Sequence, residues 1–218
     1  MTPGPRRDLI AQVASRIRLL PRRHVRRVGV DGVDGAGKTF FADELAQVLD
    51  EAGESVIRAS VDGFHRPRDE RYRLGRDSPE GFFRDSYDYV ALKAELLDRL
   101  SPGGDMRFRR AVYDVECEER LETAQELAPP SAILVFDGIF LHRPELRDYW
   151  DLSIYLEVPF EISIPRGAAR GSGPADSLAE GNRRYVEGQR IYIKECDPRA
   201  RASIVIDNTD LEVPKVLS

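Results

Sequence analysis

The chain has few of the features that mark secreted, membrane-spanning or metal-cluster proteins. Its 218 residues include only two cysteines, Cys117 and Cys196, which lie far apart and form no C-x-x-C pattern. This spacing predicts neither a disulfide framework nor a zinc site. No apolar run approaches the roughly 18 residues that span a bilayer. The arginines at 6 and 7 are not followed by an apolar segment, so we expect no signal peptide, no membrane partner and a cytoplasmic protein.

An excess of positive charge is also missing, since the formal net charge is −5. This balance argues against a general nucleic-acid binder. There is no internal repeat and no long low-complexity segment. The hydrophobic content of 41% and the charged content of 33% are those of a globular protein. We therefore expect one α/β domain over residues 1–218, with homo-oligomer formation left open.

A glycine-rich stretch is the most informative feature that is present. Residues 32–39 read G-x-x-x-x-G-K-T, after an apolar run with Val28 and Val30 and before a helical pattern. A strand, such a loop and a helix form the context of a phosphate-binding loop, whose lysine reaches the outer phosphates and whose Thr hydroxyl holds Mg²⁺. The sequence therefore predicts a site for a nucleoside triphosphate, taken as ATP, with Mg²⁺. Its residues are Gly32, Asp34, Gly35, Ala36, Gly37, Lys38, Thr39 and Phe40.

Two acidic residues follow predicted strands. Asp62 comes directly after residues 55–61, and Asp137 after the apolar run 132–136. Ligands of open α/β sheets bind beyond the carboxyl ends of the strands, so both carboxylates are expected beside the phosphate loop. With Thr39 they are the predicted metal ligands. The alternative for each is an Asp that begins a turn before a glycine.

Apolar segments near residues 28, 56, 133, 153 and 204, with helical patterns between them, predict a doubly wound, mainly parallel sheet. Residues 64–128 are predicted to be an insertion that supplies the acceptor pocket. Residues 165–180 are predicted to be a lid, because Gly171-Ser172-Gly173-Pro174 is a flexible tract. Arg166 and Arg170 would share one helix face, and Pro165 indicates that this helix starts or is kinked there.

The ordered set of motifs resembles the uridine kinase and phosphoribulokinase family. It comprises the phosphate loop and the sequences Val61-Asp62-Gly63-Phe64-His65, Tyr87-Asp88, Val112-Tyr113-Asp114 and Phe136-Asp137-Gly138-Ile139. The resemblance extends from about residue 26 to 207 and implies the fold of phosphate-loop kinases. It implies that Asp62 takes the proton of the acceptor hydroxyl and helps to organise Mg²⁺, and that Asp137 stands where the family has Glu. It further implies that Arg166 and Arg170 are lid arginines and that Tyr113 lines a nucleoside pocket.

The predicted function is ATP-dependent phosphorylation of a hydroxyl on a nucleoside (uridine- or cytidine-like) or a similar small molecule. The catalytic residues are expected to be Lys38, Asp62, Arg166 and Arg170, and the acceptor contacts Asp62, Phe64, His65, Tyr87, Tyr113 and Arg170. Uridine kinases carry a histidine just after the Tyr-Asp element and also a Phe-Asp-His-Pro run. In this chain the corresponding places are residues 115–118, which include no histidine, and residues 81–84, which read Gly-Phe-Phe-Arg. Pantothenate, nicotinamide riboside, a sugar or a sugar phosphate remain alternative acceptors.

Two other classes were weighed for the triphosphate site. A guanine-specific switch protein would carry an Asn-Lys-x-Asp element, which Asn208-Thr209-Asp210 does not supply. A regulatory protein that binds nucleotide without transfer would be expected to lose Lys38, Asp62 or the lid arginines, and all are present. The sequence therefore favours an enzyme.

Overall fold

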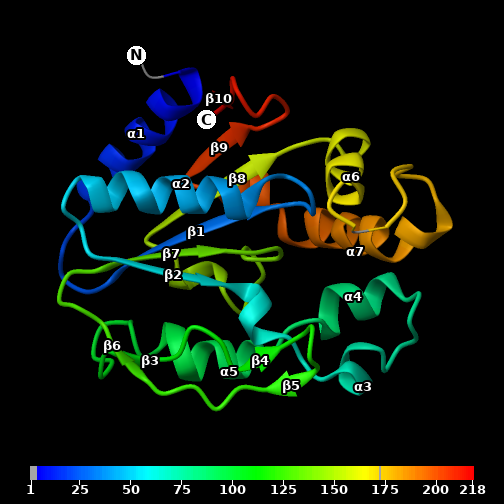
Figure 1. The fold of residues 1–218 in the computed structure, drawn as a ribbon, viewed down its shortest axis with the longest axis horizontal. Helices are drawn as coiled ribbons and strands as arrows, with labels where there is room; N and C mark the ends of the chain where they lie inside the picture. Colours follow the sequence, from blue (N-terminus) through cyan, green and yellow to red (C-terminus); the bar gives the residue numbers. More distant parts are fainter. Residues whose placement is uncertain (1–3, 172) are drawn as a thin grey trace.

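The structure, a computed structural model, describes residues 4–171 and 173–218, so Ser172 of the predicted flexible tract lies outside the described residues. Its centre is a six-stranded sheet in the order β10-β9-β8-β1-β7-β2 (Figure 1). Only β9 and β10 pair antiparallel; the other neighbours are parallel. The five strands predicted from the sequence are confirmed. The sheet comprises β1 (Arg26–Gly32), β2 (Val56–Ser60), β7 (Ile133–Asp137), β8 (Leu152–Glu157), β9 (Ile204–Asp207) and β10 (Lys215–Val216).

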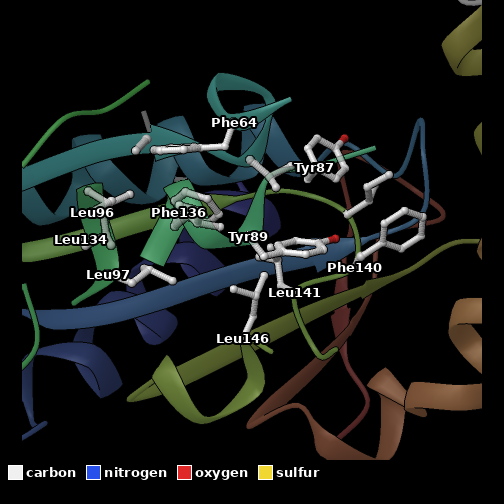
Figure 2. Close-up of a cluster of buried hydrophobic side chains, with 14 of the residues drawn as sticks. Phe64, Tyr87, Tyr89, Leu96, Leu97, Leu134, Phe136, Phe140, Leu141 and Leu146 are labelled. Atoms are coloured by element: carbon white, nitrogen blue, oxygen red, sulfur yellow. The ribbon is translucent and has the colours of Figure 1, made fainter. Parts of the chain in front are cut away.

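Both faces of the sheet are covered, which explains why every residue of β1 and β7 is buried and why residues 133–136 of β7 are apolar without alternation. Helices α1 (Pro5–Arg18) and α2 (Lys38–Glu51) lie on one face, and residues 64–128 lie on the opposite side (Figure 1). In β7, Ile133 and Val135 belong to the core under α1 and α2. Leu134 and Phe136 point into the other core, which Figure 2 shows. Successive side chains of one strand thus supply two cores.

The insertion is built from short elements. Its helices are α3 (Arg68–Arg71), α4 (Pro79–Asp85) and α5 (Tyr89–Leu92), the last continued by a π-helical turn over Lys93–Leu97. Two small antiparallel pairs complete it: β3 (Arg107–Phe108) with β6 (Glu126–Leu127), and β4 (Tyr113–Asp114) with β5 (Glu119–Arg120). The Val112 N–H donates to the carbonyl of Gly63 at 2.8 Å, which joins the insertion to the end of β2.

The remaining helices lie between β8 and β9 in the sequence. They are α6 (Phe160–Ala168), α7 (Glu180–Cys196) and α8 (Pro198–Arg201). A 3₁₀ turn at Arg147–Tyr149 precedes β8. Pro165 was predicted to start this helix α6 or to kink it; because α6 begins at Phe160 and contains Pro165, the first alternative is wrong. No helix among the described residues is both long and apolar enough to cross a membrane.

Candidate active site

The phosphate loop is shaped by two glycines in left-handed conformations. Gly35 has φ 74° and Gly37 has φ 89°, values that residues with a Cβ atom rarely adopt. A Cβ on Gly35 would lie 1.9 Å from the carbonyl oxygen of Ser163, so a larger residue would push α6 away. Helix α7 also contacts the loop, since the Asp34 N–H donates to Gln189 Oε1 at 2.6 Å. The loop is therefore held between the first turn of α2 and two helices from the end of the chain.

A cavity of about 700 Å³ opens in front of this loop. Many of the predicted site residues line it, from the loop, the ends of β2 and β7, residues 64–128 and the turn after α6. Among those predicted, the lining residues are Asp34, Gly35, Lys38, Thr39, Asp62, Tyr87, Asp137 and Arg170. Gly32, Ala36, Gly37 and Phe40 belong to the loop and the start of α2 but are not among the lining residues.

Asp34 is the acidic residue of the loop itself. Burial raises the pKa of its carboxyl group, and the neighbouring Lys38 opposes that shift. Gln189 Nε2 donates to Asp34 Oδ2 at 3.3 Å, so the carboxyl group and the N–H of Asp34 both bond to the same α7 side chain. Asp34 therefore ties α7 to the loop as well as lining the cavity.

Asp137 and Thr39 meet across the cavity floor. The Thr39 hydroxyl donates to Asp137 Oδ2 at 2.9 Å, and Asp137 is only 2% exposed. Hydroxyl and carboxylate oxygens are the hard ligands that Mg²⁺ prefers, so Thr39, Asp62 and Asp137 fit this ion chemically. Within residues 4–171 and 173–218, no cluster of three His, Cys, Asp or Glu side chains could hold a metal by itself. A metal here would depend on the phosphates of a nucleotide as well.

Asp62 lies in the 3₁₀ turn Val61–Phe64 that follows β2, and its side chain reaches the cavity. The hydroxyl of Tyr87 donates to Asp62 Oδ1 at 3.2 Å. Burial raises the pKa of Tyr87 well above its ordinary value, and the negative charge of Asp62 adds to this shift. The phenol therefore stays protonated and remains a donor to the carboxylate at neutral pH.

The cationic side chains do not all lie where their spacing predicted. Lys38 Nζ donates to the carbonyl of Val33 at 3.0 Å within the loop, and Arg170 lines the cavity with its guanidinium 5.9 Å from the Phe40 ring. Arg166 instead donates to the backbone carbonyls of Asn208, at 3.0 Å, and Thr209. The two arginines do not share a helix face, because α6 ends at Ala168 and Arg170 lies in the turn beyond it.

Three predicted acceptor contacts lie outside the cavity lining. Phe64 is fully buried in the core (Figure 2). Tyr113 lines a second cavity, of about 610 Å³, together with Tyr72 and Glu118. His65 donates from Nδ1 to the Asp62 carbonyl at 2.9 Å, and its ring centre lies 4.5 Å from that of Tyr87 at a tilt of 46°. Burial lowers the pKa of His65, and the negative charges of Asp62 and Glu118 oppose that shift.

Sequence reasoning missed several residues that shape the site. Gln189 holds the phosphate loop from α7, and Asn208 donates from Nδ2 to the carbonyl of Ala36 at 2.7 Å. Tyr185 and Asn182 of α7 line the cavity. Arg58 binds Asp137, as described below. The one available signal was Arg58 itself, a charged residue in the middle of the apolar segment 55–61.

Comparison with known proteins now adds to this geometry. The model of the protein family described as "Phosphoribulokinase / Uridine kinase family" matches residues 27–172 of this chain. The chain belongs to this family. Uridine kinases from Clostridium botulinum (strain Kyoto / Type A2) and Leuconostoc citreum (strain KM20) are 26% and 27% identical over 147 and 149 residues. Each alignment covers 66% of this chain and 67% of the relative.

Solved structures share the fold. A possible uridine kinase from Bacillus stearothermophilus superimposes with a TM-score of 0.73 at 24% identity, covering 91% of this chain and 97% of the other. A putative fructose transport system kinase from Silicibacter sp. TM1040 gives a TM-score of 0.67 at 22% identity, covering 85% and 94%. These structures show the fold, and the family match makes the chain a phosphate-loop kinase by family.

Proposed function

We propose that the protein transfers the γ-phosphoryl group of ATP to a hydroxyl group of a nucleoside or a similar small molecule. The observation that carries this proposal is the position of Asp62. Its carboxylate lies in the same cavity as Lys38, Thr39, Asp137 and Arg170. A carboxylate facing the phosphate loop is in the place that a base needs to act on an acceptor hydroxyl.

The reaction then follows from the charges around the cavity. Asp62 accepts the proton of the acceptor hydroxyl, whose oxygen forms a bond to the γ-phosphorus. The bond from that phosphorus to the β,γ-bridging oxygen breaks, and ADP leaves. Lys38 and Arg170 stabilise the negative charge that is spread over the transferring group. Mg²⁺, held by Thr39 with the carboxylates of Asp62 and Asp137 nearby, would neutralise the phosphate oxygens.

The second cavity supports a nucleoside as the leading acceptor class. Tyr72 and Tyr113 give it two aromatic side chains on which a ring can stack. Pyrimidine recognition would differ from that of uridine kinases, because residues 115–118 contain no histidine; Glu118 in this stretch binds Arg71 and Tyr113. Kinases of other small alcohols therefore remain the second candidate. Proteins described as different kinases share this fold, which supports this second candidate.

A direct test is an ATP-consumption screen with purified protein over uridine, cytidine, other nucleosides, nicotinamide riboside, pantothenate and sugars. We expect ADP to form at least tenfold faster with one acceptor than without any, and the product to carry one added phosphoryl group by mass spectrometry. Strong activity on uridine and cytidine would assign the nucleoside role. Binding of ATP with no transfer to any acceptor would favour a regulatory nucleotide-binding protein instead.

A further inference from the structure

Arg58 is a charged residue in β2, and all three nitrogens of its guanidinium group donate hydrogen bonds. Its Nε donates to Asp43 Oδ1 of α2 at 2.9 Å. Its Nη1 donates to the carbonyls of Val135, at 2.7 Å, and Ala59, at 3.1 Å. Its Nη2 donates to Asp137 Oδ1 at 2.9 Å. The planar fork is thus fixed by partners from β2, β7 and α2, which defines its orientation closely.

Both oxygens of the Asp137 carboxylate are therefore occupied by protein donors. Oδ1 accepts from Arg58, and Oδ2 accepts from the Thr39 hydroxyl at 2.9 Å. The residue is 2% exposed, whereas the Arg58 side chain is 23% exposed. A cation bound directly to Asp137 would have to share an oxygen that already accepts one of these hydrogen bonds, on a side chain that is almost fully buried.

We propose that Arg58 is a positioning residue that confines Asp137 to an indirect role toward the catalytic cation. The guanidinium neutralises the carboxylate and fixes its orientation, so that Asp137 acts by holding the Thr39 hydroxyl in place. The inference rests on the proposed binding of nucleotide with a divalent cation. It assigns a role to a residue of β2 that lies outside the phosphate loop and the lid.

The charges explain why this arrangement matters. An unpaired, buried carboxylate next to Thr39 would attract a divalent cation strongly, even without a nucleotide. Paired with Arg58, the same carboxylate contributes little net charge, so a cation is expected to depend on the nucleotide phosphates. Removal of Arg58 should therefore tighten cation binding, while removal of charge from Asp137 should have only a limited effect.

The experiment measures Mn²⁺ binding in the presence of saturating ADP, with free Mn²⁺ quantified by electron paramagnetic resonance. Wild type is compared with Arg58→Met, Arg58→Lys, Asp137→Asn and Asp43→Asn. The last is the matched control, since Asp43 binds the same guanidinium but is 60% exposed on the outer side of α2. ADP affinity without metal is measured for each variant to detect a damaged nucleotide site.

We expect Arg58→Met to bind Mn²⁺ at least about threefold more tightly than wild type, because a nearby positive charge is removed. Arg58→Lys, which keeps the charge, and Asp43→Asn should stay within about twofold. Asp137→Asn should weaken binding by less than about a hundredfold, the range for groups that act on a metal through another ligand. If Arg58→Met fails to fold, the Asp137→Asn and Arg58→Lys arms decide.

The inference is overturned if Arg58→Met binds Mn²⁺ no more tightly than wild type. It is also overturned if Asp137→Asn loses more than about a hundredfold in affinity, as expected for the loss of a direct ligand. Failure of wild type to bind Mn²⁺ with ADP would instead contradict the proposed function, together with this inference. Normal wild-type binding with unaltered variants would contradict the inference alone.

Discussion

Tyr87 shows how a single hydroxyl group can determine the geometry of the proposed transfer. Its ring is fixed by the core, 6.5 Å from Phe140, and by His65 on the other side. Residues 65 and 87 also pair as an isolated β-bridge, which holds the two backbones together. Because the hydroxyl donates to Asp62 Oδ1, the carboxylate is kept from rotating freely. We infer that the Tyr87 hydroxyl orients Asp62.

Tyr87→Phe is expected to lower kcat by roughly five- to twentyfold with little change in KM for either substrate. The substitution keeps the ring and its packing and removes only the hydrogen bond to Asp62. Steady-state kinetics with the acceptor found in the screen measures both constants. Tyr149→Phe is the matched control, because Tyr149 also donates to an aspartate, Asp98 at 2.6 Å, and neither residue lines the active-site cavity.

A different outcome would separate the two roles of Tyr87. If KM for the acceptor rises and kcat stays at the wild-type value, Tyr87 binds the acceptor and does not orient the base. Equal losses in Tyr87→Phe and Tyr149→Phe would indicate a general effect of removing a tyrosine hydroxyl group.

At the scale of elements, the phosphate loop is formed by its neighbours as much as by its own sequence. Helix α6 approaches so closely that only glycine fits at position 35. Gln189 of α7 and Asn208, just after β9, bond to backbone groups of Asp34 and Ala36. These contacts join α6, α7 and the end of β9 to the loop, so α6, α7 and the loop are expected to respond together to a bound nucleotide.

Gly35→Ala is expected to lower the free energy of unfolding by about 2–4 kcal/mol and to weaken ATP binding strongly. The added Cβ would meet the Ser163 carbonyl oxygen at 1.9 Å, in a backbone conformation with φ 74°. Denaturant unfolding and equilibrium ATP titration measure the two effects. Gly53→Ala is the control, because Gly53 has φ 81° but open space around its Cβ position. It should cost only about 1 kcal/mol and leave ATP affinity unchanged.

If both alanine variants lose the same stability and both bind ATP normally, the close approach of α6 is not a requirement of the site. A loss of ATP affinity in Gly35→Ala alone, at a stability similar to that of Gly53→Ala, would still contradict the proposed steric cost in folding.

For the whole molecule, the sequence predicted the sheet because its signals are local. Apolar runs bounded by turns gave the strands around residues 28, 56, 133, 153 and 204, and all are observed. The phosphate-loop motif and the two Asp residues after strands are local in the same sense, and the structure brings them to one cavity. These local motifs in the sequence therefore predict much of the candidate site.

What could not be predicted depends on contacts between distant segments. Arg166 and Arg170 were expected on one helix face, but the early end of α6 separates them. Phe64 lies beside the site in sequence, yet its side chain completes a core built mainly from other elements. The Arg58 contact with Asp137 joins residues 79 positions apart. Periodicity and motifs contain no information about such partners.

The central claim, that Asp62 makes the phosphate loop part of a phosphoryl-transfer site, is tested most directly with Asp62→Asn. ATP affinity and single-turnover transfer to the identified acceptor are measured on the same folded protein. We expect ATP affinity to stay within about threefold of wild type and the transfer rate to fall by about 10²–10⁴-fold. Transfer at the wild-type rate in the folded variant would contradict the role of Asp62 as the base.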